Sequence, residues 1–155
     1  MIRADFFDFE AETGKNFIGD HHKAPQPGAV SMVLPNRKRI LLVEDEEDAI
    51  DLAALALAEY EITCARNFDE GLSIAQQRDF DLYILDSWLP DKSGVELCRA
   101  IREFDTDTPI LFYSAADYAR DIEDALRAGA QDFLIKPVSI DDLDQTVALL
   151  IFLHI

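Results

Sequence analysis

From residue 39 onward, short apolar runs alternate with segments of helical periodicity, and this alternation limits the fold more than any other property of the chain. The apolar runs resemble strands buried on both faces and lie at 39–43, 61–65, 81–86, 109–114 and 132–136. The helical segments lie at 48–60, 67–77, 94–104 and 117–128, and a last one follows Ser139. Five strand–helix units predict an α/β fold, a doubly wound, five-stranded parallel sheet with helices on both faces.

Local signals support the helix boundaries. Asn67, with Glu70 three residues later, resembles a capping box at the start of the second helix. Gly129 is typical of a residue that stops a helix, and Ser139 is a suitable N-cap for the last one.

The composition excludes several classes of function. The chain has 155 residues, a formal net charge of −17 and a pI of about 4.3. This charge argues against nucleic acid and anionic membranes as partners, and it favours divalent cations and basic surfaces. No window of 18 apolar residues exists and the N-terminus is unlike a signal peptide, so we expect a cytoplasmic protein with no membrane partner.

The two cysteines, Cys64 and Cys98, form no CxxC motif, and no histidine lies at metal-binding spacing from them. We expect two buried, reduced thiols rather than a disulfide or a metal site.

Residues 1–36 differ in character from the rest of the chain. They contain three of the six prolines and three of the six glycines, together with Phe6, Phe7, Phe9 and Phe17. We interpret 1–36 as an N-terminal extension or arm and 37–155 as the domain. Disorder is one expectation for the arm; the other is that its phenylalanines anchor it on an apolar surface of the last helix or of a partner.

Polar side chains follow four of the predicted strands directly. Glu44 and Asp45 follow the first strand, Asp86 closes the third, Ser114 closes the fourth and Lys136 closes the fifth. The carboxyl ends of parallel strands meet at one edge of a sheet, where such folds bind ligands. Neighbouring carboxylates repel each other, and Mg²⁺ removes that cost. The pattern therefore predicts a magnesium site.

These residues lie within four stretches that resemble the receiver domain of two-component response regulators over about residues 38–155. The stretches are 40–46, 81–86 with Leu89, Pro90 and Gly94, 109–115, and 129–137. The resemblance implies that Asp86 is the phosphoacceptor. It also implies that Glu44, Asp45, Asp86 and the main-chain carbonyl of Trp88 hold Mg²⁺.

The resemblance assigns further roles to three residues. Ser114 matches the hydroxyl that hydrogen-bonds the phosphoryl group, Lys136 matches the lysine that pairs with it, and Phe133 matches the aromatic switch. The implied partners are a histidine kinase or a histidine phosphotransfer protein and a downstream protein. The domain would catalyse only its own phosphorylation and dephosphorylation, and because nothing follows residue 155 we expect no output domain.

Two alternatives belong to other classes of protein. A metal-dependent phosphohydrolase with an Asp nucleophile usually carries a second Asp two residues later, and this chain has Trp88 there. A flavodoxin-like nucleotide binder needs a glycine-rich or hydroxyl-rich loop after the first strand, where this chain has acids from Glu44 onward.

The last helix carries more apolar residues than one buried face needs. The stripe expected to face the sheet comprises Leu143, Val147, Leu150 and His154. A second set then points elsewhere: Leu149, Phe152 and Leu153. We expect this second set to form a homodimer or partner interface, unless the arm covers it.

Overall fold

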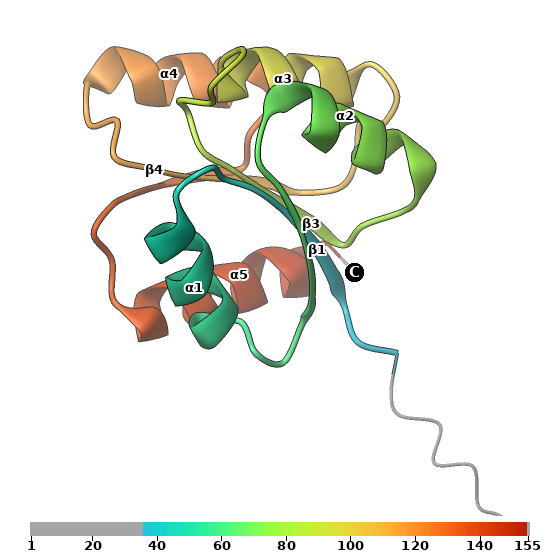
Figure 1. The fold of residues 1–155 in the computed structure, drawn as a ribbon, viewed down its shortest axis with the longest axis vertical. Coiled ribbons are helices and arrows are strands. Elements are labelled where there is room, and N and C mark those ends of the chain that lie inside the picture. The colour runs from blue at the N-terminus through green and yellow to red at the C-terminus, as the bar shows by residue number, and fades with distance from the viewer. Residues whose placement is uncertain (1–35, 155) are drawn as a thin grey trace, which may run out of the picture. The chain divides into compact units, whose positions relative to one another are not determined.

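The computed structural model describes residues 36–154 and shows a single parallel sheet with helices on both faces (Figure 1). The strands pair in the order β2-β1-β3-β4-β5. Their bounds are β1 Arg39–Val43, β2 Glu61–Ala65, β3 Leu82–Leu85, β4 Ile110–Ser114 and β5 Asp132–Ile135. The helices are α1 Glu47–Ala56, α2 Phe68–Gln77, α3 Gly94–Arg102, α4 Ala119–Ala128 and α5 Ile140–Leu153. The predicted doubly wound fold is confirmed.

The predictions for the N-terminal arm fall on residues 1–35, outside the described residues. The domain boundary at 36/37 and the anchoring role of Phe6, Phe7, Phe9 and Phe17 therefore stay predictions.

Two apolar clusters, one on each face of the sheet, form the core. On one face, residues such as Phe68, Leu97 and Ala125 pack α2, α3 and α4 against the strands. On the other face, Ile50 and Leu143 belong to the cluster that packs α1 and α5 (Figure 1). The three central strands are buried on both faces, which explains their unbroken apolar sequences.

Several helices are shorter than their apolar periodicity predicts. Helix α1 ends at Ala56 rather than at residue 60, although Leu57 is still buried in the core. The guanidinium of Arg37 hydrogen-bonds the carbonyls of Ala58 and Glu59, which lie in the turn after the helix. Leu57 still donates its N–H to the carbonyl of Ala53 but has left the helical backbone conformation, so side-chain periodicity, which follows burial, runs past the end of the helix.

The capping signals are partly confirmed. The side chain of Asn67 accepts from the N–H of Glu70 at 2.9 Å, but the Glu70 carboxylate accepts from the N–H of Arg66, so no reciprocal box closes there. A reciprocal box does form between Ser93 and Glu96 at the start of α3. Gly129 ends α4 in the left-handed region, at φ 114°.

Ser139 caps α5 by accepting from the N–H of Asp142, as predicted. The buried stripe of this helix contains Leu143 and Val147 and then continues to Ile151. The prediction for His154 is wrong, because the i+4 spacing of the buried residues leaves this side chain exposed.

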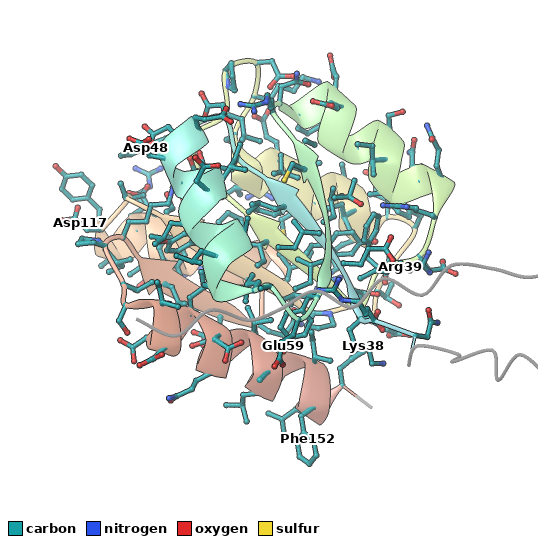
Figure 2. The ribbon with its side chains drawn as sticks, turned by 60° about the horizontal axis from the view of Figure 1, so that its bottom comes forward. Lys38, Arg39, Asp48, Glu59, Asp117 and Phe152 are labelled. Carbon is teal, nitrogen blue, oxygen red and sulfur yellow. The ribbon has the colours of Figure 1, made fainter. Side chains whose placement is uncertain are left out.

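The second apolar set on α5 is exposed, as predicted. Leu149, Phe152 and Leu153 are 56%, 70% and 69% exposed, and Figure 2 shows Phe152 pointing away from the body of the domain. Within residues 36–154, this set has no cover.

The cysteine prediction is half right. Cys98 is buried in α3, whereas Cys64 is exposed. The difference arises because β2 is an edge strand that the helices cover only in part, so that Ala65 alone among its residues is fully buried.

Within the described part of the chain, no helix has both the length and the apolar character that crossing a membrane requires.

Candidate functional site

The site lies where β1, β3, β4 and β5 end at the same edge of the sheet. Val43 pairs with Leu85 across β1 and β3, so the residues that follow them, Glu44 and Asp86, are neighbours. The N–H of Asp86 donates to the carbonyl of Val43 at 3.0 Å. The strand register therefore places the Cα atoms of Glu44 and Asp86 side by side.

Three carboxylates gather at this edge. Glu44 and Asp86 are only 1% and 7% exposed, whereas Asp45 is exposed to solvent. One oxygen from each of the three lies within 4.8 Å of the other two. One acid is therefore open to solvent and two are buried, an arrangement that requires compensating positive charge.

Lys136 supplies part of that charge. Its ammonium lies 2.5 Å from Glu44 Oε2, while Glu44 Oε1 accepts from the N–H groups of Asp45 and Glu46. Burial lowers the pKa of Lys136, but the hydrogen bond that its ammonium donates to Glu44 and the negative charge of Asp86 outweigh this effect and raise the pKa overall. The ammonium also lies 5.0 Å from the centroid of the Tyr113 ring. Lys136 is therefore charged at neutral pH and is held on the acidic group.

Asp86 retains free coordinating capacity. Its Oδ1 is buried and has no hydrogen-bond partner among the described residues. A buried carboxylate oxygen without a partner is costly unless a cation or a ligand satisfies it. With oxygen donors from Glu44, Asp45 and Asp86 in reach of one another, the group fits a hard divalent cation such as Mg²⁺.

Trp88 lies in the loop between β3 and α3. An antiparallel bridge joins it to Ser93, and its side chain is 59% exposed. Trp88 follows Asp86 by two residues, and its indole ring faces outward.

Ser114 lies beside Ser87, the residue after Asp86, and Phe133 lies on the neighbouring strand β5. Ser114 is fully buried, and its Oγ accepts from the N–H of Ala116 at 3.2 Å and from the N–H of Ser87 at 3.4 Å. Phe133 is half-buried on β5 and stacks on Phe112, with ring centroids 5.7 Å apart. The N–H of Lys136 donates to the carbonyl of Ser114, which links the ends of β4 and β5.

Gly94 is a site residue that the sequence pattern did not assign a role. A Cβ on this residue would lie 1.9 Å from the carbonyl oxygen of Asp86, so only glycine allows α3 to begin there. The sequence signal for this role is the glycine directly after the N-cap serine. That signal does not show that the carbonyl of Asp86 lies against the glycine.

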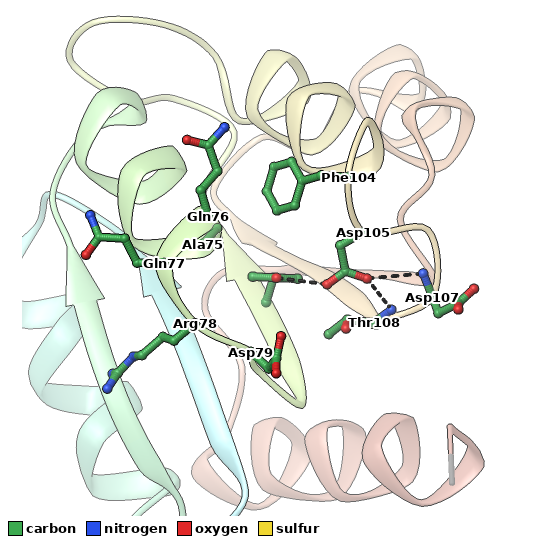
Figure 3. A pocket seen from close by; sticks show the side chains of 10 residues that line it. Ala75, Gln76, Gln77, Arg78, Asp79, Phe104, Asp105, Asp107 and Thr108 are labelled. Carbon is green, nitrogen blue, oxygen red and sulfur yellow. Dashed lines mark hydrogen bonds between the residues drawn. The ribbon is translucent and has the colours of Figure 1, made fainter.

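A cavity away from the carboxylates lies on another part of the domain. It has a volume of about 530 Å³ and is lined by the end of α2 and the loop between α3 and β4 (Figure 3). Asp105 lines it and accepts hydrogen bonds from Tyr83, Asp107 and Thr108. A smaller cavity, of about 280 Å³, includes Ser87 and Trp88 beside the carboxylates.

The geometry defines a receiver-type acidic site on a doubly wound sheet, and comparison with known proteins agrees. The model of the response regulator receiver domain matches residues 40–148. The chain belongs to this family of phosphoacceptor signalling domains. The family assignment favours the receiver interpretation over the phosphohydrolase and nucleotide-binding alternatives.

Individual relatives support the same assignment. The chain is 39% identical over 107 residues to the uncharacterized transcriptional regulatory protein YkoG of Bacillus subtilis, covering 67% of this chain and 46% of the relative. It is 36% identical over 107 residues to the nisin biosynthesis regulatory protein NisR of Lactococcus lactis, covering 68% and 46%. Among solved structures, a CheY-like receiver domain protein from Methanospirillum hungatei superposes with a TM-score of 0.73 at 27% identity, covering 76% of this chain and 96% of that one.

The chain spans about half the length of the curated relatives it matches. These matches therefore do not test the expectation that no output domain follows. Relatives named transcriptional regulators also weaken the expectation that nucleic acid is not a partner, which rested on the net charge of this chain alone.

Proposed function

We propose that the domain accepts a phosphoryl group on Asp86 from a histidine kinase or a histidine phosphotransfer protein, and that this changes a protein-interaction face. The observation that carries the proposal is the unpartnered, buried Oδ1 of Asp86 within a group of acids that Lys136 partly neutralises. A carboxylate with a free oxygen is available both as a ligand and as a nucleophile.

The transfer step needs no other nucleophile from the protein. A carboxylate oxygen of Asp86 attacks the phosphorus of the donor phosphohistidine, the new P–O bond forms and the P–N bond breaks. The bonding electrons leave with the imidazole nitrogen, and the product is an acyl phosphate. The ammonium of Lys136 stabilises negative charge on the phosphoryl oxygens, so catalysis depends mainly on position and electrostatics.

Glu44, Asp45, Asp86 and the main-chain carbonyl of Trp88 would hold Mg²⁺. When bound, the ion supplies positive charge that screens the acids from one another and from the incoming phosphoryl group. Glu44 already orients Lys136 through a 2.5 Å contact, so the same carboxylate would position two cations.

Ser114 and Phe133 would transmit the effect of phosphorylation from Asp86 to the surface of the domain. The hydroxyl of Ser114 gives up its contacts with the N–H groups of Ser87 and Ala116 and donates to a phosphoryl oxygen. Phe133, stacked on Phe112, then has room to turn inward, which alters the surface around α4, β5 and α5.

The experiment is incubation of the full chain with phosphoramidate and Mg²⁺, followed by intact mass measurement. The parent should gain one phosphoryl group and Asp86→Asn should gain none. Asp107→Asn is the matched control, since Asp107 is exposed and lies in the loop between α3 and β4, before β4 begins. Labelling of Asp86→Asn to the level of the parent would refute the proposal.

A further inference from the structure

Asp91 makes an unusual set of contacts from the loop that also carries Trp88. Its Oδ1 accepts from the N–H of Phe68 at 2.8 Å, and its Oδ2 accepts from the N–H of Asp69 at 3.1 Å. Oδ1 also accepts from the N–H of Lys92 at 3.0 Å, which fixes the carboxylate within its own loop.

These contacts complete the start of α2. Phe68 and Asp69 are the first residues of this helix, so their N–H groups have no partner inside it. Asn67, the N-cap, satisfies only the N–H of Glu70. Helix α2 therefore depends on a carboxylate from a loop more than twenty residues away along the chain.

A cation–π contact also joins the same loop to the core. The ammonium of Lys92 lies 4.4 Å from the centroid of the Phe68 ring, and Phe68 is buried in the apolar cluster beneath α2. A cation over an aromatic face is attractive, and here the ring cannot move without disturbing the core.

The turn between β2 and α2 also contacts the loop that carries Glu44 and Asp45. The N–H of Glu44 donates to the carbonyl of Ala65 at 2.9 Å, and Arg66 pairs with Glu47 at 2.6 Å. Residues 65–69 thus touch both loops from which the magnesium ligands would come.

We propose that Asp91 is a positioning residue for the magnesium site and that residues 65–69 couple metal binding to the order of the first turn of α2. The inference rests on the proposed function, because it takes Glu44, Asp45, Asp86 and the Trp88 carbonyl as ligands. Coupling between two sites is reciprocal, so a metal ion that fixes the Trp88 loop also holds Asp91 on α2, and loss of Asp91 weakens the metal.

A purely structural cap would behave differently. Removal of such a cap would lower the melting temperature but would leave the affinity for Mg²⁺ unchanged. Loss of coupling changes both quantities, so the test measures metal affinity and local amide exchange in addition to stability.

The experiment compares the full-length parent, Asp91→Ala and Asp69→Asn by calorimetric titration with Mg²⁺. We expect about a tenfold weaker affinity in Asp91→Ala, the size of effect seen when groups that orient ligands are removed. Asp69→Asn removes a negative charge from the same turn, but it keeps the backbone N–H that Asp91 binds, so its affinity should stay within about twofold of the parent.

Hydrogen exchange provides the second readout. In the parent, Mg²⁺ should slow amide exchange at residues 68–71, and in Asp91→Ala it should not. If Asp91→Ala fails to fold, Asp91→Asn replaces it, because an amide keeps one acceptor oxygen. Its affinity should then fall by about threefold.

The outcomes separate the two proposals. Parent-like affinity in the Asp91 variant, or Mg²⁺-dependent protection of 68–71 that persists in it, overturns the positioning role and leaves the proposed function standing. Absence of Mg²⁺ binding in the parent overturns the metal site of the proposed function and the coupling with it.

Discussion

Gly94 shows how little space separates α3 from the end of β3 at Asp86. Because a Cβ at this position would meet the Asp86 carbonyl at 1.9 Å, Gly94→Ala must displace either the helix or the end of β3. We expect a loss of about 2 kcal/mol or more in the free energy of unfolding, together with slower phosphorylation of Asp86.

Gly129→Ala is the control for this prediction. It imposes a side chain at φ 114° and brings its Cβ within 2.9 Å of Arg102 Nε, so it also destabilises the domain, but far from the site. Urea unfolding should show that both variants are less stable than the parent. Phosphoramidate labelling should be slower than in the parent only for Gly94→Ala. Equal labelling rates would contradict the proposed role of the close approach.

The two cysteines should differ sharply in reactivity. Burial raises the pKa of Cys98 to about 11, so its thiolate is scarce at pH 8 and its sulfur is out of reach. Cys64 is exposed. Native protein treated with a maleimide should gain one adduct by mass and denatured protein two, whereas native Cys64→Ser should gain none. Two adducts on the native parent would contradict this prediction.

At the scale of elements, most boundaries could be predicted because they depend on nearby residues. The apolar runs located all five strands, and Gly129 and Ser139 located two helix ends. The sequence did not predict the features that depend on tertiary contacts. Leu57 is buried beyond the end of α1. Asp91 caps helix α2, although it lies 23 residues away from the start of that helix in the sequence.

The loop between α3 and β4 should make stability depend on acid pH. Burial raises the pKa of Asp105, but hydrogen bonds from Thr108, Tyr83 and Asp107 outweigh it and lower the pKa overall (Figure 3). A carboxylate with a lowered folded-state pKa stabilises the fold above its unfolded pKa, about 3.9. That stabilisation is lost as the pH falls through the folded value.

Asp105→Asn should therefore be less stable than the parent at pH 7, and the difference should shrink toward pH 3. Urea unfolding at several pH values measures it. Asp107→Asn is the comparison, because that side chain is exposed at the same loop. A constant difference between Asp105→Asn and the parent across this range would rule out the ionised carboxylate as the cause.

At the scale of the whole molecule, the fold and the gathering of Glu44, Asp86, Ser114 and Lys136 could be predicted together, since a parallel sheet brings the carboxyl ends of its strands to one edge. Their detailed contacts could not. The pairing of Lys136 with Glu44 rather than with another acid depends on side-chain geometry, which alternation of apolar residues does not specify.

Association is the property of the whole molecule that the exposed residues of α5 predict. Leu149, Phe152 and Leu153 form an apolar set on one helix, and we expect phosphorylation to promote a homodimer through it. Light scattering should show a larger mass after phosphoramidate treatment in the parent and a monomer in Phe152→Glu. Leu55→Glu, at an equally exposed leucine on α1, should behave like the parent. A monomeric parent in both states would end the dimer hypothesis.

The ion pair between Lys136 and Glu44 joins residues 92 positions apart, and it has a consequence for synthesis on the ribosome. A nascent chain that has emerged only as far as β4 contains the acids but lacks Lys136, the cation that pairs with Glu44 in the complete sheet. By the route proposed above, such a chain would lack the ammonium that stabilises negative charge on the incoming phosphoryl group. On the proposed function, efficient phosphorylation would therefore begin only once β5 has joined the sheet.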